Sequence, residues 1–177
     1  MDISDKEIIE GCIRKDAKYQ RMLYDRYSSV LFGVCRKNAK CQEDAEDIFQ
    51  EAFIKLYYSL EKYSFLGSFE GWLRKFFMRV AWNYYRDRKD KYQRIEIADN
   101  STQSVESLVF EEFSNQQLLE CLQRLGDKER MVLVMSEIEG LSWEETAQMV
   151  DLEVPTVRSM CSRAKKKLVD SFMNYNK

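Results

Sequence analysis

The sequence contains no histidine, one proline and six glycines among its 177 residues. The absence of histidine excludes imidazole-based catalytic triads and removes the most common general base. The five cysteines are odd in number and form no Cys-X-X-Cys motif, which argues against a zinc site or a disulfide framework. Catalysis by carboxylates alone stays open, but no constellation of residues points to it, and we expect no enzyme, catalytic residue, metal or cofactor. We interpret the cysteines as small buried apolar residues.

The sequence also lacks any apolar run near the length of a membrane-spanning helix, and its start, MDISDKEIIEGCIRKD, is too charged for a signal peptide. We expect a cytoplasmic protein with no direct membrane insertion. Glu, Lys, Leu and Arg are abundant, whereas proline and glycine are rare. This composition favours an all-α fold.

The net charge of −2 hides a strong segregation of charge along the chain. Residues 74–94 hold eight basic and two acidic side chains, and residues 158–168 hold five basic and no acidic ones. Between them, residues 95–113 hold five acidic and no basic side chains. Because affinity for DNA comes largely from neutralising phosphates, the two basic segments are candidate nucleic-acid contacts.

Apolar residues recur at helical spacing through the first half of the chain and predict four helices, over residues 5–14, 17–38, 42–60 and 70–91. The third of these helices has an apolar side and a polar side. The polar side carries Asp44, Asp47, Gln50 and Glu51. It is either a solvated acidic face or a docking surface for a basic partner.

An aromatic loop, residues 63–69, immediately precedes the most basic helix, residues 70–91. Cationic and aromatic side chains are interleaved along that helix. Rings that stack on bases, beside cations that bind phosphates, are typical of proteins that bind single-stranded nucleic acid. A core helix with a basic outer face explains most of these aromatic residues equally well, but it explains the aromatic loop less well.

Residues 98–106, ADNSTQSVE, are small and polar, and they predict a flexible linker between two domains. Helical spacing resumes over residues 108–125, and a further helix is predicted over residues 128–139 with Asp127 as its N-cap. The predicted boundaries give a first domain, an acidic linker and a second domain at residues 1–94, 95–113 and 114–177.

The segment LSWEETAQMVDLEVPTVRSMCSRAKKKL, residues 141–168, predicts a helix–turn–helix. Ser142 and Glu145 have the spacing of a capping box, and Gly140 suits the end of a preceding helix. Pro155 fits the first turn of the second helix, where its missing N–H costs little. That helix is apolar on one side and basic on the other, which suits a DNA major groove. A helical hairpin with a solvated basic face is the alternative.

These segments, in this order, resemble the extracytoplasmic-function (ECF) group of the sigma-70 family, the smallest initiation factors of bacterial RNA polymerase. The resemblance covers nearly the whole chain. The motifs that carry it are LYDRY (23–27), DAEDIFQEAFIKLY (44–57), FEGWL (69–73), the polar linker, EGLSWEETAQMV (139–150) and PTVRSMCSRAKKKL (155–168). It implies two helical domains, called region 2 and region 4, and a sigma factor that binds core polymerase, recognises the −35 and −10 promoter elements and assists promoter melting.

The resemblance also implies a role for each surface of region 2. The acidic helix docks on a coiled coil of the polymerase β′ subunit through Asp44, Asp47, Gln50 and Glu51. The aromatic loop and the basic helix bind the −10 element and capture a flipped base, which requires a pocket. The implied −10 contacts are Lys55, Tyr63, Phe65, Phe69, Trp72, Arg74, Arg79, Asn83, Arg86 and Arg88.

In region 4, the second helix of the helix–turn–helix reads the −35 element in the major groove. Its implied contacts are Thr156, Arg158, Ser159, Ser162, Arg163 and Lys166. Seven residues after the tryptophan of FEGWL, the family commonly has Asn, and this chain has Arg79. The guanidinium of Arg is a planar cation that only donates hydrogen bonds, whereas the amide of Asn can donate and accept at one base. Where the family often has a basic residue, this chain has Met160. If Met160 lies on the reading face, substituting Arg there should strengthen −35 binding.

The resemblance further implies contact with the β flap of the polymerase, an anti-sigma factor as a partner, and a monomeric protein. Two other interpretations stay open at the level of sequence. A stand-alone helix–turn–helix regulator would bind duplex DNA without polymerase, and an adaptor would bind polymerase without promoter DNA.

Overall fold

The structure is a computed structural model that describes residues 3–91 and 115–175. Every regular element within those two ranges is helical, which confirms the predicted all-α fold. In chain order the elements are α1 (Asp5–Ile13), α2 (Ala17–Asn38), α3 (Gln42–Tyr57), the short 3-10 helix η1 (Leu60–Lys62), α4 (Phe69–Lys91), α5 (Asn115–Gln123), α6 (Asp127–Leu133), the π-helical segment η3 (Val134–Ile138), α7 (Trp143–Val150) and α8 (Val154–Tyr175). The predicted linker, residues 95–113, lies outside the described residues, and the domain boundaries stay predictions.

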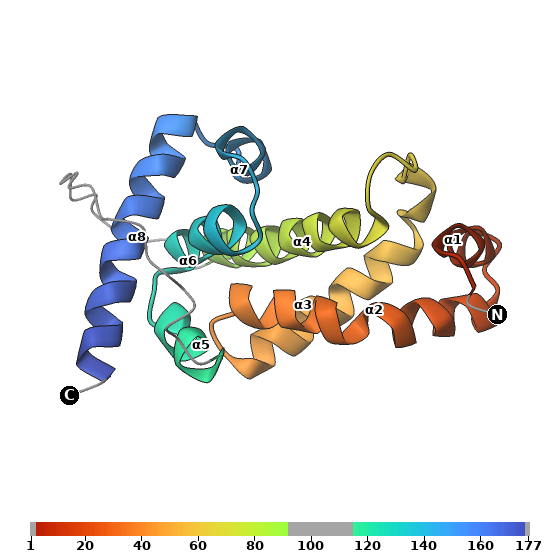
Figure 1. Ribbon diagram of the computed structural model, residues 1–177, viewed down its shortest axis with the longest axis horizontal. Helices are drawn as coiled ribbons and strands as arrows, with labels where there is room; N and C mark the ends of the chain where they lie inside the picture. Colours follow the sequence, from red (N-terminus) through yellow and green to blue (C-terminus); the bar gives the residue numbers. More distant parts are fainter. Residues whose placement is uncertain (1–2, 92–114, 176–177) are drawn as a thin grey trace.

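The first four helices form a bundle in which α2 contacts α1, α3 and α4, and α3 contacts α4. Figure 1 shows α1 at the N-terminal end of the molecule and α8 at the opposite end. The apolar stripe predicted for α3 faces the bundle core. Its buried members are Ala45, Ile48, Ala52, Phe53 and Leu56. The same packing holds the polar side of α3 outward and places α4 beside it.

The predicted helix–turn–helix is present as α7 and α8. Ser142 and Glu145 form the predicted capping box, and Gly140 adopts a φ of +72°, a conformation that glycine enters at no steric cost. Asp151 ends α7 in the left-handed region, and Pro155 lies in the first turn of α8. The inward side of α8 is buried through Val157, Cys161, Ala164 and Leu168. These local signals therefore place the whole motif correctly.

Two expectations for the second half are wrong. Met160 is only 7% exposed, because it follows Val157 by one helical turn and faces the core with it. Arginine at position 160 would bury a charge and is no longer expected to strengthen DNA binding. Gly126, not Asp127, is the N-cap of α6. Asp127 is the first helical residue and pairs with Arg130 at 2.9 Å.

Four of the five cysteines are buried, as expected for small apolar residues, and burial raises the pKa of the Cys35 thiol to about 12. Cys41 differs: it is partly exposed at the N-cap position of α3.

In the described part of the chain, no cluster of three or more potential metal ligands occurs. None of the described helices combines the length and apolar character needed to cross a membrane.

Substitution of two helical glycines by alanine is expected to have opposite effects on stability. A Cβ atom on Gly11 would lie 2.1 Å from Cγ of Tyr19, so Gly11→Ala should lower the free energy of unfolding by about 2 kcal/mol through overpacking. Gly33 lies within α2 with open space around its Cα, so Gly33→Ala should raise it by about 0.5–1 kcal/mol. Urea unfolding of both variants tests the pair, and a stable Gly11→Ala would contradict the α1–α2 packing.

Candidate nucleic-acid interface

The polar side of α3 is an exposed stripe that combines carboxylates with apolar side chains. Asp47 and Gln50 are exposed, and Glu51 is half-buried. Ile54 and Tyr58 continue the stripe at four-residue steps, with exposed fractions of 62% and 80%. Exposed apolar side chains beside polar ones are typical of protein–protein contacts. The sequence interpretation missed Ile54 and Tyr58, although their helical spacing from Gln50 was visible.

Asp44 does not belong to this exposed stripe. Only 15% of its side chain is exposed, and it accepts hydrogen bonds from the Tyr84 hydroxyl at 2.9 Å and the Tyr85 hydroxyl at 2.8 Å. Arg88 adds a third contact at 2.7 Å, and its guanidinium lies 4.3 Å from the Tyr84 ring centroid. Burial raises the pKa of the Asp44 carboxyl, but the three hydrogen bonds outweigh burial and hold the pKa below its usual value. Asp44 therefore ties α3 to the end of α4.

Asp44→Asn is expected to lower the free energy of unfolding at neutral pH by about 2 kcal/mol, because an amide cannot accept all three charge-assisted bonds. The native pKa lies below the unfolded value of about 4, so the contribution is complete above that pH and disappears as pH falls through the native pKa. The difference between wild type and variant should therefore shrink below about pH 4. Urea unfolding at several pH values measures it. Asp47→Asn is the control: Asp47 is exposed, its 3.1 Å contact with the Tyr84 hydroxyl can also be accepted by an amide oxygen, and stability should change by less than about 0.5 kcal/mol.

The aromatic loop divides into a buried base and an exposed tip. Tyr63 is 7% exposed and donates its hydroxyl to the carbonyl of Gly67 at 2.9 Å. Phe65, at the tip, is 50% exposed and has a φ of +58°, a conformation that aromatic residues rarely adopt. Leu66 beside it is 82% exposed and was missed by the sequence interpretation, which considered only aromatic and charged residues. The tip thus presents apolar atoms outward from a fixed backbone.

Below the tip, aromatic rings form a continuous stack. Phe69 is buried, and the half-buried Trp72 is stacked between it and Phe76, with ring centroids 6.0 Å and 5.6 Å away. Tyr63 contacts both Phe69 and Trp72. Of the aromatic residues in the predicted −10 set, Tyr63 and Phe69 are therefore part of the core, Trp72 is at its edge and Phe65 is at the surface.

The basic side chains of α4 are in different environments. Arg79 is exposed, and Asn83 one turn later is half-buried. Arg86 is exposed and pairs with the adjacent Asp87 at 3.1 Å. Arg74 is half-buried and pairs with Glu70 on its own helix. Lys55 of α3, also in the predicted −10 set, is exposed and pairs with Glu51.

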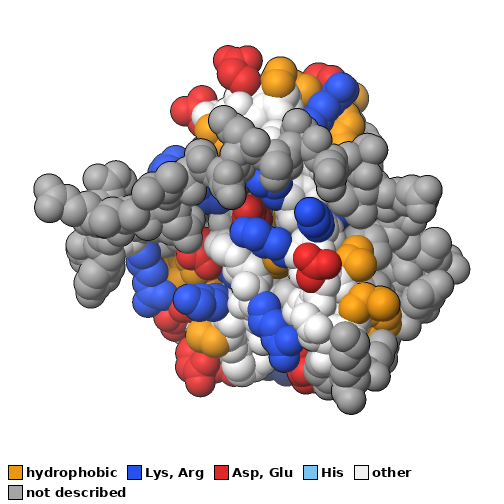
Figure 2. Space-filling view, turned by 90° about the vertical axis from the view of Figure 1, so that its left-hand side faces the viewer, with side chains coloured by type: hydrophobic (Ala, Val, Ile, Leu, Met, Phe, Trp, Pro, Cys, Tyr) orange, Lys and Arg blue, Asp and Glu red, His pale blue; other side chains and the backbone are white. Residues whose placement is uncertain are grey.

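The outward side of α8 contains all six residues predicted for the −35 element. Thr156, Arg158 and Lys166 are exposed, and the other three, Ser159, Ser162 and Arg163, are half-buried. The Arg158 guanidinium lies 5.9 Å from the ring centroid of Trp143 on α7, which links the two helices of the motif. Figure 2 shows Lys and Arg side chains gathered on the middle of the face seen from the side of α8. The helix is therefore apolar inside and basic outside, as its sequence predicts.

Comparison with known proteins assigns both halves of the chain. A family model described as Sigma-70 region 2 matches residues 23–91, and one described as Sigma-70, region 4 matches residues 115–168. An "ECF RNA polymerase sigma-E factor" from Haemophilus influenzae is 28% identical over 175 residues, covering 92% of each chain. The Escherichia coli K12 protein of the same description is also 28% identical, covering 92% of this chain and 91% of its own.

Two solved structures share the fold. CnrH, in complex with the cytosolic domain of CnrY, has a TM-score of 0.56 at 20% identity and covers 98% of this chain and 99% of its own. The sigma factor RpoE of Bartonella quintana, in complex with the anti-sigma factor NepR, has a TM-score of 0.59 at 16% identity. It covers 86% of this chain and 96% of its own.

Fold and matches together define the class of protein, a transcription initiation factor that is not an enzyme. The chain belongs to the sigma-70 family and, within it, to the ECF group. It is a sigma factor, which binds RNA polymerase core and directs promoter-specific transcription. The stand-alone helix–turn–helix regulator required a first half that serves some other purpose. Residues 23–91 match Sigma-70 region 2 instead, which favours the sigma factor over that regulator.

Proposed function

We propose that this sigma factor acts through three surfaces, of which the first is the exposed stripe of α3. This stripe binds a basic surface of the core polymerase, with carboxylates pairing to cations and apolar side chains filling the contact. The proposed contacts are Asp47, Gln50, Glu51, Ile54 and Tyr58. Asp44, the fourth residue of the predicted set, does not contact the polymerase in this proposal. It holds α3 against α4 through its hydrogen bonds to Tyr84 and Tyr85.

The second surface is the loop tip with α4, which binds the −10 element as strands separate. Phe65 and Leu66 supply the exposed apolar wall against which a flipped base rests, while Tyr63, Phe69 and Trp72 form its floor. Lys55, Arg74, Arg79 and Arg86 bind phosphates, and Asn83 is available to a base edge. Arg88 supports the end of α4 through Asp44 and is not proposed as a DNA contact.

The third surface is the outward side of α8, which enters the major groove of the −35 element through its N-terminal turns. Arg158 and Arg163 are the side chains able to form bidentate bonds to guanine, and Thr156, Ser159 and Ser162 complete the face. Lys166 lies further along the helix and binds phosphate. Because Met160 is in the core, the reading face has no gap at that position.

The same proposal extends to location and regulation. The sigma factor RpoE of Bartonella quintana is in complex with the anti-sigma factor NepR, which supports an anti-sigma factor for this chain as well. A cytoplasmic monomer that joins the polymerase at its β′ coiled coil and β flap fits this arrangement.

The observation that carries the proposal is the placement of an acidic–apolar stripe, an aromatic–basic helix and a recognition helix on α3, α4 and α8 of one chain. Run-off transcription with purified core polymerase and a promoter library tests it. Promoter-specific transcripts are expected only when both the core and this protein are present. Specific binding of duplex DNA by the protein alone, with no effect on transcription, would instead indicate a regulator.

A further inference from the structure

The aromatic loop, residues 63–69, is closed by a hydrogen bond from its first residue. The Tyr63 hydroxyl donates to the carbonyl oxygen of Gly67 at 2.9 Å. The Tyr63 ring is itself fixed, because it is 7% exposed and packs against Phe69 and Trp72 with ring centroids 5.1 Å and 5.4 Å away. The hydroxyl therefore holds the far side of the loop tip against a ring that belongs to the core.

The backbone of the tip is held in uncommon conformations. Phe65 has a φ of +58° and Gly67 a φ of +85°. Only glycine enters this region at no steric cost, so the backbone of Phe65 is strained. Such strain persists only where surrounding contacts impose it, and it is concentrated at functional sites. Two contacts that impose it come from Tyr63: the hydrogen bond to Gly67, and the ring that lies 5.0 Å from the Phe65 ring between centroids.

The strained conformation gives the fold little apolar burial in return. Phe65 remains 50% exposed and Leu66 remains 82% exposed. Burying either side chain would stabilise the protein, yet the tip holds both of them in water. A backbone that is strained and still presents apolar side chains to solvent is explained by a ligand that covers them. In the proposed function that ligand is a flipped base.

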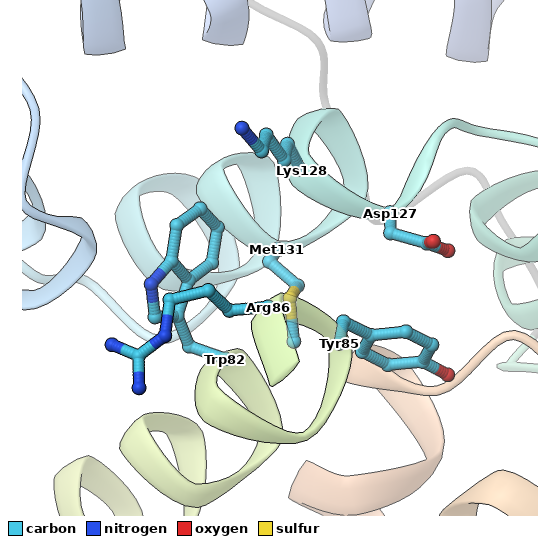
Figure 3. Close-up of a pocket in the computed structure, with 6 residues that line it drawn as sticks. All are labelled: Trp82, Tyr85, Arg86, Asp127, Lys128 and Met131. Atoms are coloured by element: carbon cyan, nitrogen blue, oxygen red, sulfur yellow. The ribbon is translucent and has the colours of Figure 1, made fainter. Parts of the chain in front are cut away.

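A cavity further along α4 is too far away to receive that base. Figure 3 shows this cavity between α4 and α6. It is lined by Trp82, Tyr85, Arg86, Asp127, Lys128 and Met131. Trp82 comes thirteen residues after Phe69, the first residue of α4, which is about 20 Å along the helix axis. Capture of a base at the loop therefore depends on the conformation of the tip itself.

We propose that the Tyr63 hydroxyl is a positioning group for base capture: its bond to Gly67 holds Phe65 in the conformation that receives the flipped base. This inference rests on the proposed role of the tip in −10 binding, and it adds the group that sets the geometry of the tip. The hydroxyl acts through Phe65 and does not contact the base. Without it, the tip populates several conformations, and if about a fifth of them can capture the base, capture is about fivefold weaker.

The experiment follows promoter opening by the holoenzyme, with the strongest promoter recovered from the run-off library. The probe is 2-aminopurine in the non-template −10 strand, whose fluorescence rises when the base leaves the stack. Stopped-flow measurement over a range of holoenzyme concentrations separates the Kd of the closed complex from the rate constant of opening. Tyr63→Phe removes only the hydroxyl. It is expected to lower the rate constant of opening about fivefold and to leave the Kd of the closed complex within about twofold of wild type.

A second variant and a matched control accompany Tyr63→Phe. A Cβ atom on Gly67 would meet nothing within 4 Å, so Gly67→Ala disturbs only the left-handed backbone, and it should also slow opening about fivefold. The control is Tyr57→Phe, which removes a hydroxyl that donates to the carbonyl of Gln20 at 3.3 Å, outside the loop. Its opening rate should stay within about twofold of wild type, and a slowing equal to that of Tyr63→Phe overturns the inference.

The Phe65→Ala background distinguishes positioning from a general loss of stability. Phe65→Ala alone should slow opening about 20-fold, because the base loses its stacking partner. Adding Tyr63→Phe should then cause no further loss, since the hydroxyl acts only through Phe65.

Two results overturn positioning by Tyr63 and leave the proposed function intact. One is wild-type opening by Tyr63→Phe while Phe65→Ala is slow, and the other is losses that multiply in the double variant. Wild-type opening by Phe65→Ala instead rejects the proposed role of the tip, and the inference with it. Absence of promoter-specific transcripts with the wild-type protein rejects the proposed function as a whole.

Discussion

Arg130→Met is expected to lower the free energy of unfolding by about 3 kcal/mol, the largest stability effect of any single substitution considered for this protein. The guanidinium is fully buried and donates to the carbonyls of Asn38 and Leu125 and to the Asp127 carboxylate at 3.1, 3.2 and 2.9 Å. Methionine fills much of the volume but leaves two carbonyls and a carboxylate without their donor. Because Asp127 is 20% exposed, water relieves part of this loss, and the effect falls at the low end of the range for broken buried pairs.

Urea unfolding followed by circular dichroism measures this effect. Arg124→Met removes an exposed arginine that donates to Ser171 at 3.3 Å, and it should change stability by less than about 0.5 kcal/mol. Combining Arg130→Met with Asp127→Asn should recover part of the loss, since the carboxylate charge is then absent. A loss below about 1 kcal/mol for Arg130→Met alone would be inconsistent with a buried guanidinium that joins the two halves.

Reversal of charge on α3 is expected to have the largest effect on activity. The double variant Asp47→Lys/Glu51→Lys places two cations against the basic surface proposed on the polymerase, and like charges across an interface cost several kcal/mol. Affinity for core polymerase should fall by about 100-fold, or about 3 kcal/mol, and run-off transcription should fall with it at limiting protein concentration. Both positions face solvent or nearly so, and the fold should be retained.

Glu10→Lys/Glu144→Lys is the matched control for this reversal. It changes the net charge by the same amount at exposed positions on α1 and α7, away from the proposed contact. Its affinity for core should stay within about threefold of wild type, since exposed charges contribute little, including the exposed Glu10–Lys6 ion pair. Equal losses in the two double variants would show that total charge, and not the α3 stripe, determines binding. Ile54→Ser and Tyr58→Ser then test the apolar part of the stripe in the same assay.

Elements that depend on neighbours in sequence were predictable. Ser142, Glu145, Gly140 and Pro155 act within one or two helical turns, and each occupies the position that its spacing predicts. The apolar stripe of α3 and the inner side of α8 follow the 3.6-residue period for the same reason. The family motifs follow the same helices, so the outward residues of α3 and α8 could be named before their surroundings were known.

Features that depend on contacts far apart in sequence were not predictable. Asp44 has the same helical pattern as its exposed neighbours, and contacts with Tyr84, Tyr85 and Arg88, about forty residues later, cover most of its side chain. Met160 was assigned outward by comparison with a family pattern, although its three-residue step from Val157 predicts burial. Nothing in the local sequence indicates that Glu139 pairs with two cations of region 2.

The burial of Glu139 beside an exposed α8 gives the two kinds of charge contact different sensitivities to salt. Only 3% of the Glu139 side chain is exposed, so its pairs with Lys37 and Arg74 are screened weakly by dissolved ions. Arg158 and Lys166 lie in solvent, where screening is strong. A moderate rise in ionic strength should therefore weaken DNA contact by α8 while the two halves of the protein stay paired.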